Sequence, residues 1–191
     1  KYPSAKTGYT DSWYAAERSI GDIFIACPGK FTADTVSTLY SKGTLKAAKT
    51  FFYHFEHIPL FMKDEDAVYV NHGDELPYVL HLLQMMRNEA SPLDRRSRDT
   101  FSDFTTADLM ATYWGNFLIS HDPNKQSGFG MSLSNNNIRP WGEYAANNGS
   151  AHAIREGTRA GVYSLADFRK AQCDYLIPNI DADIKKDFGT A

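Results

Sequence analysis

A lone histidine in the segment VYVNHGDELPYVL, residues 68–80, has the setting that best suits chemistry. His72 follows an apolar, β-favouring run and precedes Gly73, which permits a tight backbone turn. Because imidazole titrates near neutral pH, His72 could take a proton from a nucleophile and return it to a leaving group. The local pattern alone fits a structural core or loop histidine better than a general base whose partners lie elsewhere.

The residues after this turn predict a short helix. Asp74 and Glu75 stand where helix N-caps are found. Leu76, Val79 and Leu80 follow at helical spacing, and we expect them to pack inward. The histidine would thus stand on a turn between an extended run and a small helix.

The other histidines and the familiar motifs give no second site. His54 and His57 lie three apart on an expected strand, so they would project to opposite faces and could not share a metal ion. The remaining histidines stand in expected helix-end or loop contexts without a ligand partner: His81, His121 and His152. Residues 130–134, GMSLS, end in Ser where a nucleophile elbow needs Gly, and no phosphate-binding or dinucleotide motif is present. We therefore expect no metal and no cofactor.

Composition indicates a folded protein without affinity for nucleic acid. The 191 residues are 42% hydrophobic and 23% charged, which suits one sizeable core. The net charge is -3 and the basic residues are scattered, so nucleic acid is not an expected partner. No apolar run reaches the roughly 18 residues of a membrane span, and no signal segment opens the sequence.

Three features bear on processing and location. Asn148 begins the N-glycosylation sequon Asn-Gly-Ser in a polar stretch. Cys27 and Cys173 lie far apart, and the sequence alone cannot pair them, so two buried thiols remain an alternative. The sequon and the cysteine count both point toward the secretory pathway. The first residue is Lys1, which we interpret as a processing or cleavage point.

Local patterns alternate between helical and extended segments. Residues 32–41 carry apolar side chains at helical spacing and stop before Gly43, a suitable terminator. Residues 50–57, TFFYHFEH, are short and aromatic-rich, which favours a buried strand. Residues 105–120 show two adjacent apolar rows at i, i+4 spacing, which predicts a helix. This alternation favours an α/β fold.

The last third of the sequence predicts two short extended pieces and a final helix. Residues 141–144 and 160–163 have the extended pattern. Ser164 stands at the expected N-cap of the final helix, which carries Cys173 and would end before Pro178.

Five blocks together resemble the C-terminal part of the type-B carboxylesterase/lipase family, the cholinesterase-like branch of the α/β-hydrolases. In chain order they are GDIFIACP (21–28), FFYHFEH (51–57), NHGDELPYVL (71–80), TYWGNFLISHDPN (112–124) and RPWGEY (139–144). The third resembles the catalytic-histidine segment of the family, and the fourth its YW-x-NF…PN helix and turn. Members usually have Pro where this sequence has Gly142. The resemblance covers the sequence from roughly Tyr9 to Ile177.

The resemblance implies an incomplete α/β-hydrolase fold. Residues 1–191 would form the C-terminal segment of a single α/β-hydrolase domain, with part of the central sheet and its flanking helices. Residues 1–19 would be a surface loop at a cleavage point, and residues 179–191 a tail. An N-terminal portion would be needed to complete the fold.

The same resemblance implies roles for particular residues. His72 would be the triad histidine, with Gly73 and Glu75 supporting it. Since the triad order in this fold is Ser, acid, His, the nucleophile and the acid would lie on an N-terminal part, as would the oxyanion-hole amides. That part would be a separate chain or an upstream segment. Cys27 and Cys173 stand where many secreted members have a disulfide, which implies a bond between them and an extracellular location.

Two functions fit this resemblance. The favoured one is a serine-type carboxylic-ester hydrolase acting on a small-molecule or lipid ester, with an apolar substrate pocket near residues 61–70 and 80–86, although those side chains could equally be core. The alternative is a non-catalytic adhesion or assembly protein, because HGDELPYVL also resembles neuroligins. The ending VYSLADFRKAQCDYLIPNI is more similar to fungal esterases and lipases, which favours the enzyme.

Overall fold

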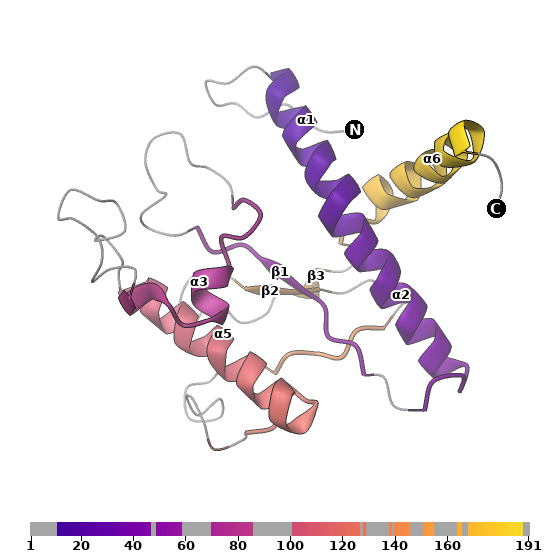
Figure 1. The fold of residues 1–191 in the computed structure, drawn as a ribbon. Coiled ribbons are helices and arrows are strands. Elements are labelled where there is room, and N and C mark those ends of the chain that lie inside the picture. The colour runs from indigo at the N-terminus through magenta and orange to yellow at the C-terminus, as the bar shows by residue number, and fades with distance from the viewer. Residues whose placement is uncertain are drawn as a thin grey trace. The chain divides into compact units, whose positions relative to one another are not determined.

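The structure is a computed structural model in which the chain forms two compact units. It describes residues 11–46, 49–58, 70–85, 101–126, 128, 138, 140–145, 151–154, 164–165 and 168–188. The first unit comprises Lys1–Thr50, Tyr144–Ser150 and Leu165–Ala191, and the second comprises Phe51–Glu143 and Ala151–Ser164. The elements are α1 (Asp11–Gly21), η1 (Asp22–Ala26), α2 (Cys27–Ser41), β1 (Tyr53–Phe55), α3 (Leu76–Val79), α5 (Phe101–Ser120), β2 (Ala151–Ile154), β3 (Ser164–Leu165) and α6 (Lys170–Phe188) (Figure 1).

A continuous helical rod opens the described part of the first unit. α1 passes without a break into the π-helix η1 and then into α2 (Figure 1). In η1 the Cys27 N–H donates to the Asp22 carbonyl, five residues back, which inserts one extra residue into the turn. The expected surface loop over residues 1–19 is therefore wrong for residues 11–19. The run AAER, whose residues are mostly strong helix formers, is the signal that was overlooked.

The predicted helix over residues 32–41 is confirmed as the second half of α2. Cys27, Lys30 and Ala33 are buried at a spacing of three, so one face of the helix is covered. Gly43 adopts a left-handed φ of 73° and its N–H donates to the Tyr40 carbonyl at 2.9 Å. This is the backbone geometry that favours glycine after a helix end.

The final helix differs from its expected bounds. Ser164 lies in β3 rather than at a helix N-cap, and α6 begins at Lys170. Pro178 lies inside α6, which continues to Phe188, so residues 179–188 are helical and the expected tail is wrong there. Proline removes one N–H donor and its ring crowds the carbonyl four residues back, but here the helix continues past it.

A small parallel sheet lies in the second unit. β1 pairs with β2 in parallel, with Tyr53 opposite His152 and Phe55 opposite Ile154, and the strand order is β1-β2-β3. Parallel neighbours require a long crossover, and α3 and α5 lie in the chain between these strands. The predicted strand over residues 50–57 is confirmed with shorter bounds. The mixture of helices and a small parallel sheet is compatible with part of an α/β fold.

The two expected extended pieces have different outcomes. Residues 141–144 form no regular strand, and residues 160–163 lie outside the described residues. Strand β2, whose four residues are all buried, was not predicted from the sequence.

Helix α5 and the aromatic residues facing it make the core of the second unit. The buried cluster consists of Phe55, Tyr78, Leu83, Ala107, Leu109, Met110, Tyr113, Ile138, Trp141 and Ile154. Asn124 fixes the segment that carries Trp141, because its side chain accepts from Trp141 N at 2.6 Å and donates to Trp141 O at 2.9 Å. Asn116 donates to the Pro123 carbonyl at 3.1 Å, which closes the turn after α5. The helix predicted over residues 105–120 is confirmed and begins four residues earlier.

In the part of the chain that the structure describes, none of the helices combines the length and the apolar character needed to cross a bilayer.

Candidate active site

His72 lies exposed on a tight turn that joins Val70 to helix α3. The Asn71 N–H donates to Asp74 Oδ2 at 2.5 Å, and the Asp74 N–H returns a bond to the Asn71 carbonyl at 3.3 Å. These two bonds close the turn around the histidine. Both bonds involve Asn71 and Asp74 alone, and the exposed imidazole of His72 makes no hydrogen bond to another described residue.

Gly73 is required at its position by the backbone. Its φ is 90°, a conformation that side-chain-bearing residues rarely adopt. A Cβ built there would meet Leu76 Cδ1 at 3.8 Å, which is an ordinary contact, so space is not the constraint. The tight turn expected from the sequence is therefore present, and it directs the chain from His72 into α3.

Helix α3 packs only partly as expected, because Val79 lies partly buried against the core while the other two residues predicted to pack inward do not. Leu76 and Leu80 are 52% and 59% exposed, so the prediction that they pack inward is wrong. Tyr78 and Leu83 are buried instead, at 0% and 1% exposure. The helix has only four residues, too few for the i, i+4 rule to place its apolar face. Glu75 is its N-cap residue by position, but its side chain makes no capping hydrogen bond.

A buried carboxylate lies behind this helix. Asp103 of α5 is 1% exposed, and its Oδ1 accepts from the Tyr78 hydroxyl at 2.9 Å and from His57 Nε2 at 2.7 Å. A carboxylate only accepts, so Nε2 is the His57 nitrogen that carries the proton. Sequence reasoning missed this cluster because its members are 25 and 46 residues apart. A polar residue within an apolar helix face was the available signal at Asp103.

The charges around the turn act on one another. Burial raises the pKa of the Asp74 carboxyl, the Asn71 backbone bond lowers it, and the negative charge of Glu75 raises it again. Burial also raises the pKa of Tyr53 to about 12, with a further contribution from Glu75. Glu75 therefore lies close enough to act electrostatically on β1 as well as on the turn. Its predicted role in supporting His72 stays a prediction.

The other histidines take different environments. His54 contacts Glu56 Oε1 at 3.0 Å through Nδ1, and exposed His81 contacts Asp108 Oδ1 at 2.6 Å through Nε2. His152 was expected in a loop or at a helix end, but it lies buried in β2. Among the described residues, no group of three or more His, Cys, Asp or Glu side chains could hold a metal ion.

His152 is a core residue despite its polarity. Its ring stacks on Trp141 at a centroid distance of 4.9 Å and meets the edge of Tyr113 at 5.4 Å. Neither ring nitrogen has a hydrogen-bond partner among the described residues. Burial lowers the pKa of His152 to about 4, so the ring is neutral at physiological pH. A neutral buried ring of this kind packs as an aromatic side chain.

An apolar pocket of about 210 Å³ also lies in the second unit. Its lining is Phe51, Tyr53, Tyr113, Trp114, Phe117, Pro123 and Trp141. These residues differ from the expected substrate-pocket segments. Of those segments, Leu83 is core and Leu80 and Met85 are exposed, while residues 61–69 and 86 lie outside the described residues.

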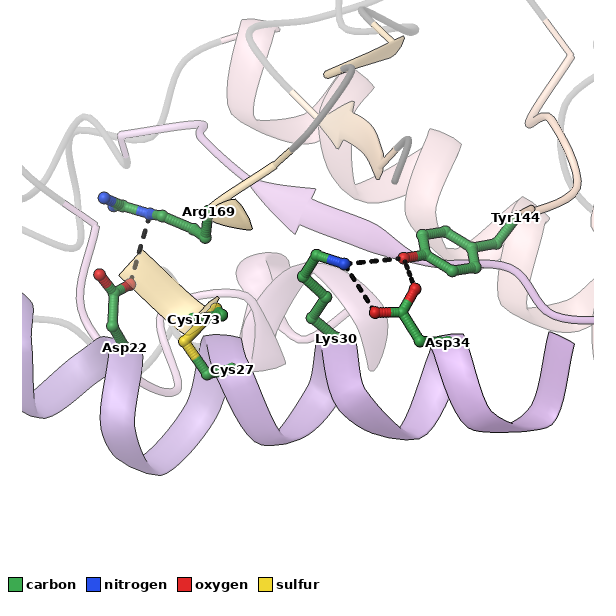
Figure 2. The surroundings of a disulfide bond; sticks show 7 residues. All are labelled: Asp22, Cys27, Lys30, Asp34, Tyr144, Arg169 and Cys173. Carbon is green, nitrogen blue, oxygen red and sulfur yellow. Dashed lines mark hydrogen bonds and ion pairs between the residues drawn. A yellow bond between two sulfur atoms is a disulfide. The ribbon is translucent and has the colours of Figure 1, made fainter. Parts of the chain in front are cut away.

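In the first unit, a disulfide joins Cys27 at the start of α2 to Cys173 in α6 (Figure 2). The Cα atoms are 5.2 Å apart, and both cysteines are buried. On one side of the bond, Arg169 Nε contacts Asp22 Oδ1 at 3.3 Å (Figure 2). The ion pair joins the same two parts of the chain as the disulfide.

A polar cluster lies one turn further along the same helix face (Figure 2). Lys30 Nζ contacts Asp34 Oδ2 at 2.6 Å, and the Tyr144 hydroxyl donates to Asp34 Oδ1 at 2.6 Å. Burial raises the pKa of Tyr144, and the hydrogen bond to Asp34 raises it further. The cluster therefore fixes Tyr144 as a neutral donor and serves the packing of α2. The predicted glycosylation site Asn148 lies outside the described residues.

Comparison with known proteins identifies the family. No curated protein matches the chain. A family model described as the carboxylesterase family matches residues 2–175, which include the His72 turn, the α5 segment and both cysteines. The family supports a hydrolase that acts on esters. The chain therefore belongs to the carboxylesterase family.

Proposed function

We propose that this chain is the C-terminal part of a serine-type carboxylic-ester hydrolase in which His72 is the general base. The observation that carries the proposal is the family match over residues 2–175 together with an exposed His72 on a closed turn. The turn holds the imidazole outside the core, where a nucleophile and an acid from elsewhere can reach its two nitrogens. The nucleophile, the acid and the oxyanion hole lie on an N-terminal part, either a separate chain or an upstream segment.

The reaction needs no metal or cofactor. His72 takes the proton of the serine hydroxyl while the serine oxygen attacks the ester carbonyl carbon. The tetrahedral intermediate collapses, the imidazolium gives its proton to the departing alcohol, and an acyl-enzyme remains. Water then attacks the acyl group with the same histidine as base, which releases the carboxylic acid and restores the serine. The substrate class is a small-molecule or lipid ester.

Exposed apolar side chains support the need for an N-terminal part. In the first unit, Phe24 and Phe31 on the helical rod are 73% and 57% exposed. In the second unit, Phe101 and Leu118 of α5 are 87% and 77% exposed. Ile20 and Ile25 are exposed on the same rod, and Phe117 and Ile119 are exposed beside Leu118. Such runs of exposed apolar residues mark surfaces that another part of the protein can cover. Residues 1–191 are in this proposal one segment of a single α/β-hydrolase domain.

An extracellular location fits this enzyme. The Cys27–Cys173 disulfide requires an oxidising compartment to persist. The sequon at Asn148 would carry a glycan in that compartment.

Labelling with a fluorophosphonate ester probe tests the proposal. The native protein, with every chain that purifies with it, is sequenced by mass spectrometry and then treated with the probe. We expect label on a serine of the N-terminal part, and we expect His72→Asn to abolish it. His81→Asn is the matched control, because His81 is also exposed and Asn tolerates its φ of 55°. A native protein that takes no label would refute the esterase and favour a non-catalytic, cholinesterase-like adhesion or assembly protein.

A further inference from the structure

We infer that Asp103 is a positioning residue, which holds the His72 turn in place through Tyr78 and helix α3. This inference rests on the proposed role of His72 as the general base. Asp103 lies on α5 and contacts neither a substrate nor a reacting atom in this scheme. Its effect passes through the helix that follows the turn.

The anchor is a single carboxylate oxygen that binds two elements. Asp103 Oδ1 accepts from the Tyr78 hydroxyl of α3 at 2.9 Å and from His57 Nε2, which follows β1, at 2.7 Å. The side chains of Asp103 and His57 are 1% and 2% exposed, and Tyr78 is fully buried. Hydrogen bonds to an ionised acceptor are stronger than neutral ones, and water does not compete at this depth. The segment that follows β1, the short helix α3 and the long helix α5 therefore meet at one atom.

The anchor matters because α3 cannot hold itself in place. A helix of four residues is too short to be stable alone, so its position depends on what its side chains contact. Leu76 and Leu80 are exposed and Val79 is only partly buried against the core, so Tyr78 is the fully buried side chain of the helix. The Tyr78 ring lies 5.2 Å from Phe55 and 5.1 Å from His57. The contacts with these two rings orient the plane of the Tyr78 ring, and the hydrogen bond to Asp103 sets how far the side chain reaches toward α5.

Backbone bonds carry this anchor back to the catalytic turn. The Tyr78 N–H donates to the Glu75 carbonyl at 3.0 Å, and the Leu76 N–H donates to the Gly73 carbonyl at 3.1 Å. Gly73 follows His72 directly. Five residues thus separate Tyr78 from His72, and successive hydrogen-bonded turns occupy that interval.

Stability alone does not explain why a carboxylate is buried at position 103. A buried charged group loses its hydration, and an apolar residue of similar size often serves packing as well or better. Two donors aimed at one oxygen give a defined geometry that an apolar contact does not. Fixing a catalytic side chain to within about an ångström is a role that needs this geometry, since a misplacement of that size can cost about 100-fold in rate.

A second pair on the same elements provides a matched control. Asp108, also on α5, accepts from His81 Nε2 at 2.6 Å just after α3. Its side chain and that of His81 are 51% and 49% exposed, so this pair is hydrated and holds its partners weakly. Asp103→Asn and Asp108→Asn make the same chemical change on one helix, once in the core and once at the surface.

The test uses the native protein with its N-terminal part. The kcat and KM for a p-nitrophenyl ester are measured per active site, counted by fluorophosphonate titration. Hydrogen exchange of the peptide that contains residues 70–79 is followed by mass spectrometry. We expect Asp103→Asn to lower kcat by about 10- to 100-fold with little change in KM, and to speed exchange in that peptide. Asp108→Asn should change neither.

Tyr78→Phe guards against a folding defect, because it removes the hydroxyl and keeps the packed ring. It should also speed exchange at residues 70–79 and lower kcat. If Asp103→Asn and Tyr78→Phe match Asp108→Asn in both kcat and exchange, or if only KM rises, Asp103 does not position His72 and the inference is wrong. An inactive, unlabelled native protein would instead refute the proposed function and remove the catalytic role of Asp103 with it.

Discussion

Removing the Cys27–Cys173 disulfide should cost the protein much of its stability. The bond joins residues 146 positions apart, so it closes most of the chain into one loop. In the chain-entropy model, a loop of this length restricts the unfolded chain by about 5 kcal/mol at 25 °C. The Asp22–Arg169 ion pair still joins the same elements in the folded state. We therefore expect the folded geometry to persist without the disulfide. The stability should fall because the unfolded chain gains conformational entropy.

The perturbation is Cys27→Ala with Cys173→Ala, which leaves no buried hydroxyl or free thiol. Urea unfolding of the native protein, followed by tryptophan fluorescence, should show the free energy of unfolding lowered by about 3–5 kcal/mol. Reducing agent should have the same effect on the unmodified protein and none on the double variant. Reduction should be slow under native conditions, because the two cysteines are 1% and 3% exposed.

The disulfide prediction has a clear contrary result. If the double variant loses less than about 1 kcal/mol while the slope of unfolding free energy against urea stays unchanged, the unfolded chain is not restricted as argued. A lower slope would instead show that the reduced unfolded chain keeps residual structure.

Three further predictions concern single residues. The pKa of His152 is about 4 in the folded protein and about 6.5 in the unfolded chain, so the unfolded chain binds the proton first as the pH falls. The free energy of unfolding should therefore be highest above pH 6.5 and fall by about 3 kcal/mol toward pH 4. His152→Phe should remove this pH dependence. If the free energy of unfolding in urea depends on pH equally in the variant and the unmodified protein, the prediction is wrong. Gly73→Ala should destabilise by about 1–2 kcal/mol because of its φ of 90°. Gly115→Ala, inside α5 with open space at Cβ, should stabilise by up to about 1 kcal/mol, and a thermal melt that reverses these signs would contradict both.

The sequence predicted long periodic elements better than short ones. Residues 105–120 have enough turns for the apolar rows to average out exceptions, and α5 is present with its end at Ser120. The four residues of α3 hold one turn, so Leu76 and Leu80 suggested the wrong buried face. Ser164 had the chemistry of an N-cap, but pairing in β3 determined its conformation. In short elements, tertiary contacts determine the conformation more than the intrinsic helix or strand propensity of the residues does.

The chemistry of the turn was predictable from local sequence, and its anchor was not. Gly73 after a histidine signals a left-handed residue, which the φ of 90° bears out. No local pattern relates Asp103 to Tyr78 or His57, because a salt bridge or hydrogen bond across elements depends on how α5 packs against β1. The proposed role of His72 comes from the family resemblance, and the residues behind the turn are known only from the packing.

The proposed role of His72 as general base places two demands on its side chain, and the structure meets each with a different residue. In that role, the imidazole of His72 has to reach a serine and an acid on another part of the protein, and its exposure means that it is not held by its own burial. It must also be fixed, because the gain from general base catalysis depends on a constant distance to the serine oxygen. The buried hydrogen bond between Tyr78 and Asp103 can fix the position of the turn and still leave His72 exposed, because the Tyr78 ring lies in the core six positions along the chain. Buried Tyr78 would fix the turn, and exposed His72 would reach the substrate. Losing the Tyr78–Asp103 hydrogen bond should therefore lower kcat although His72 is still present.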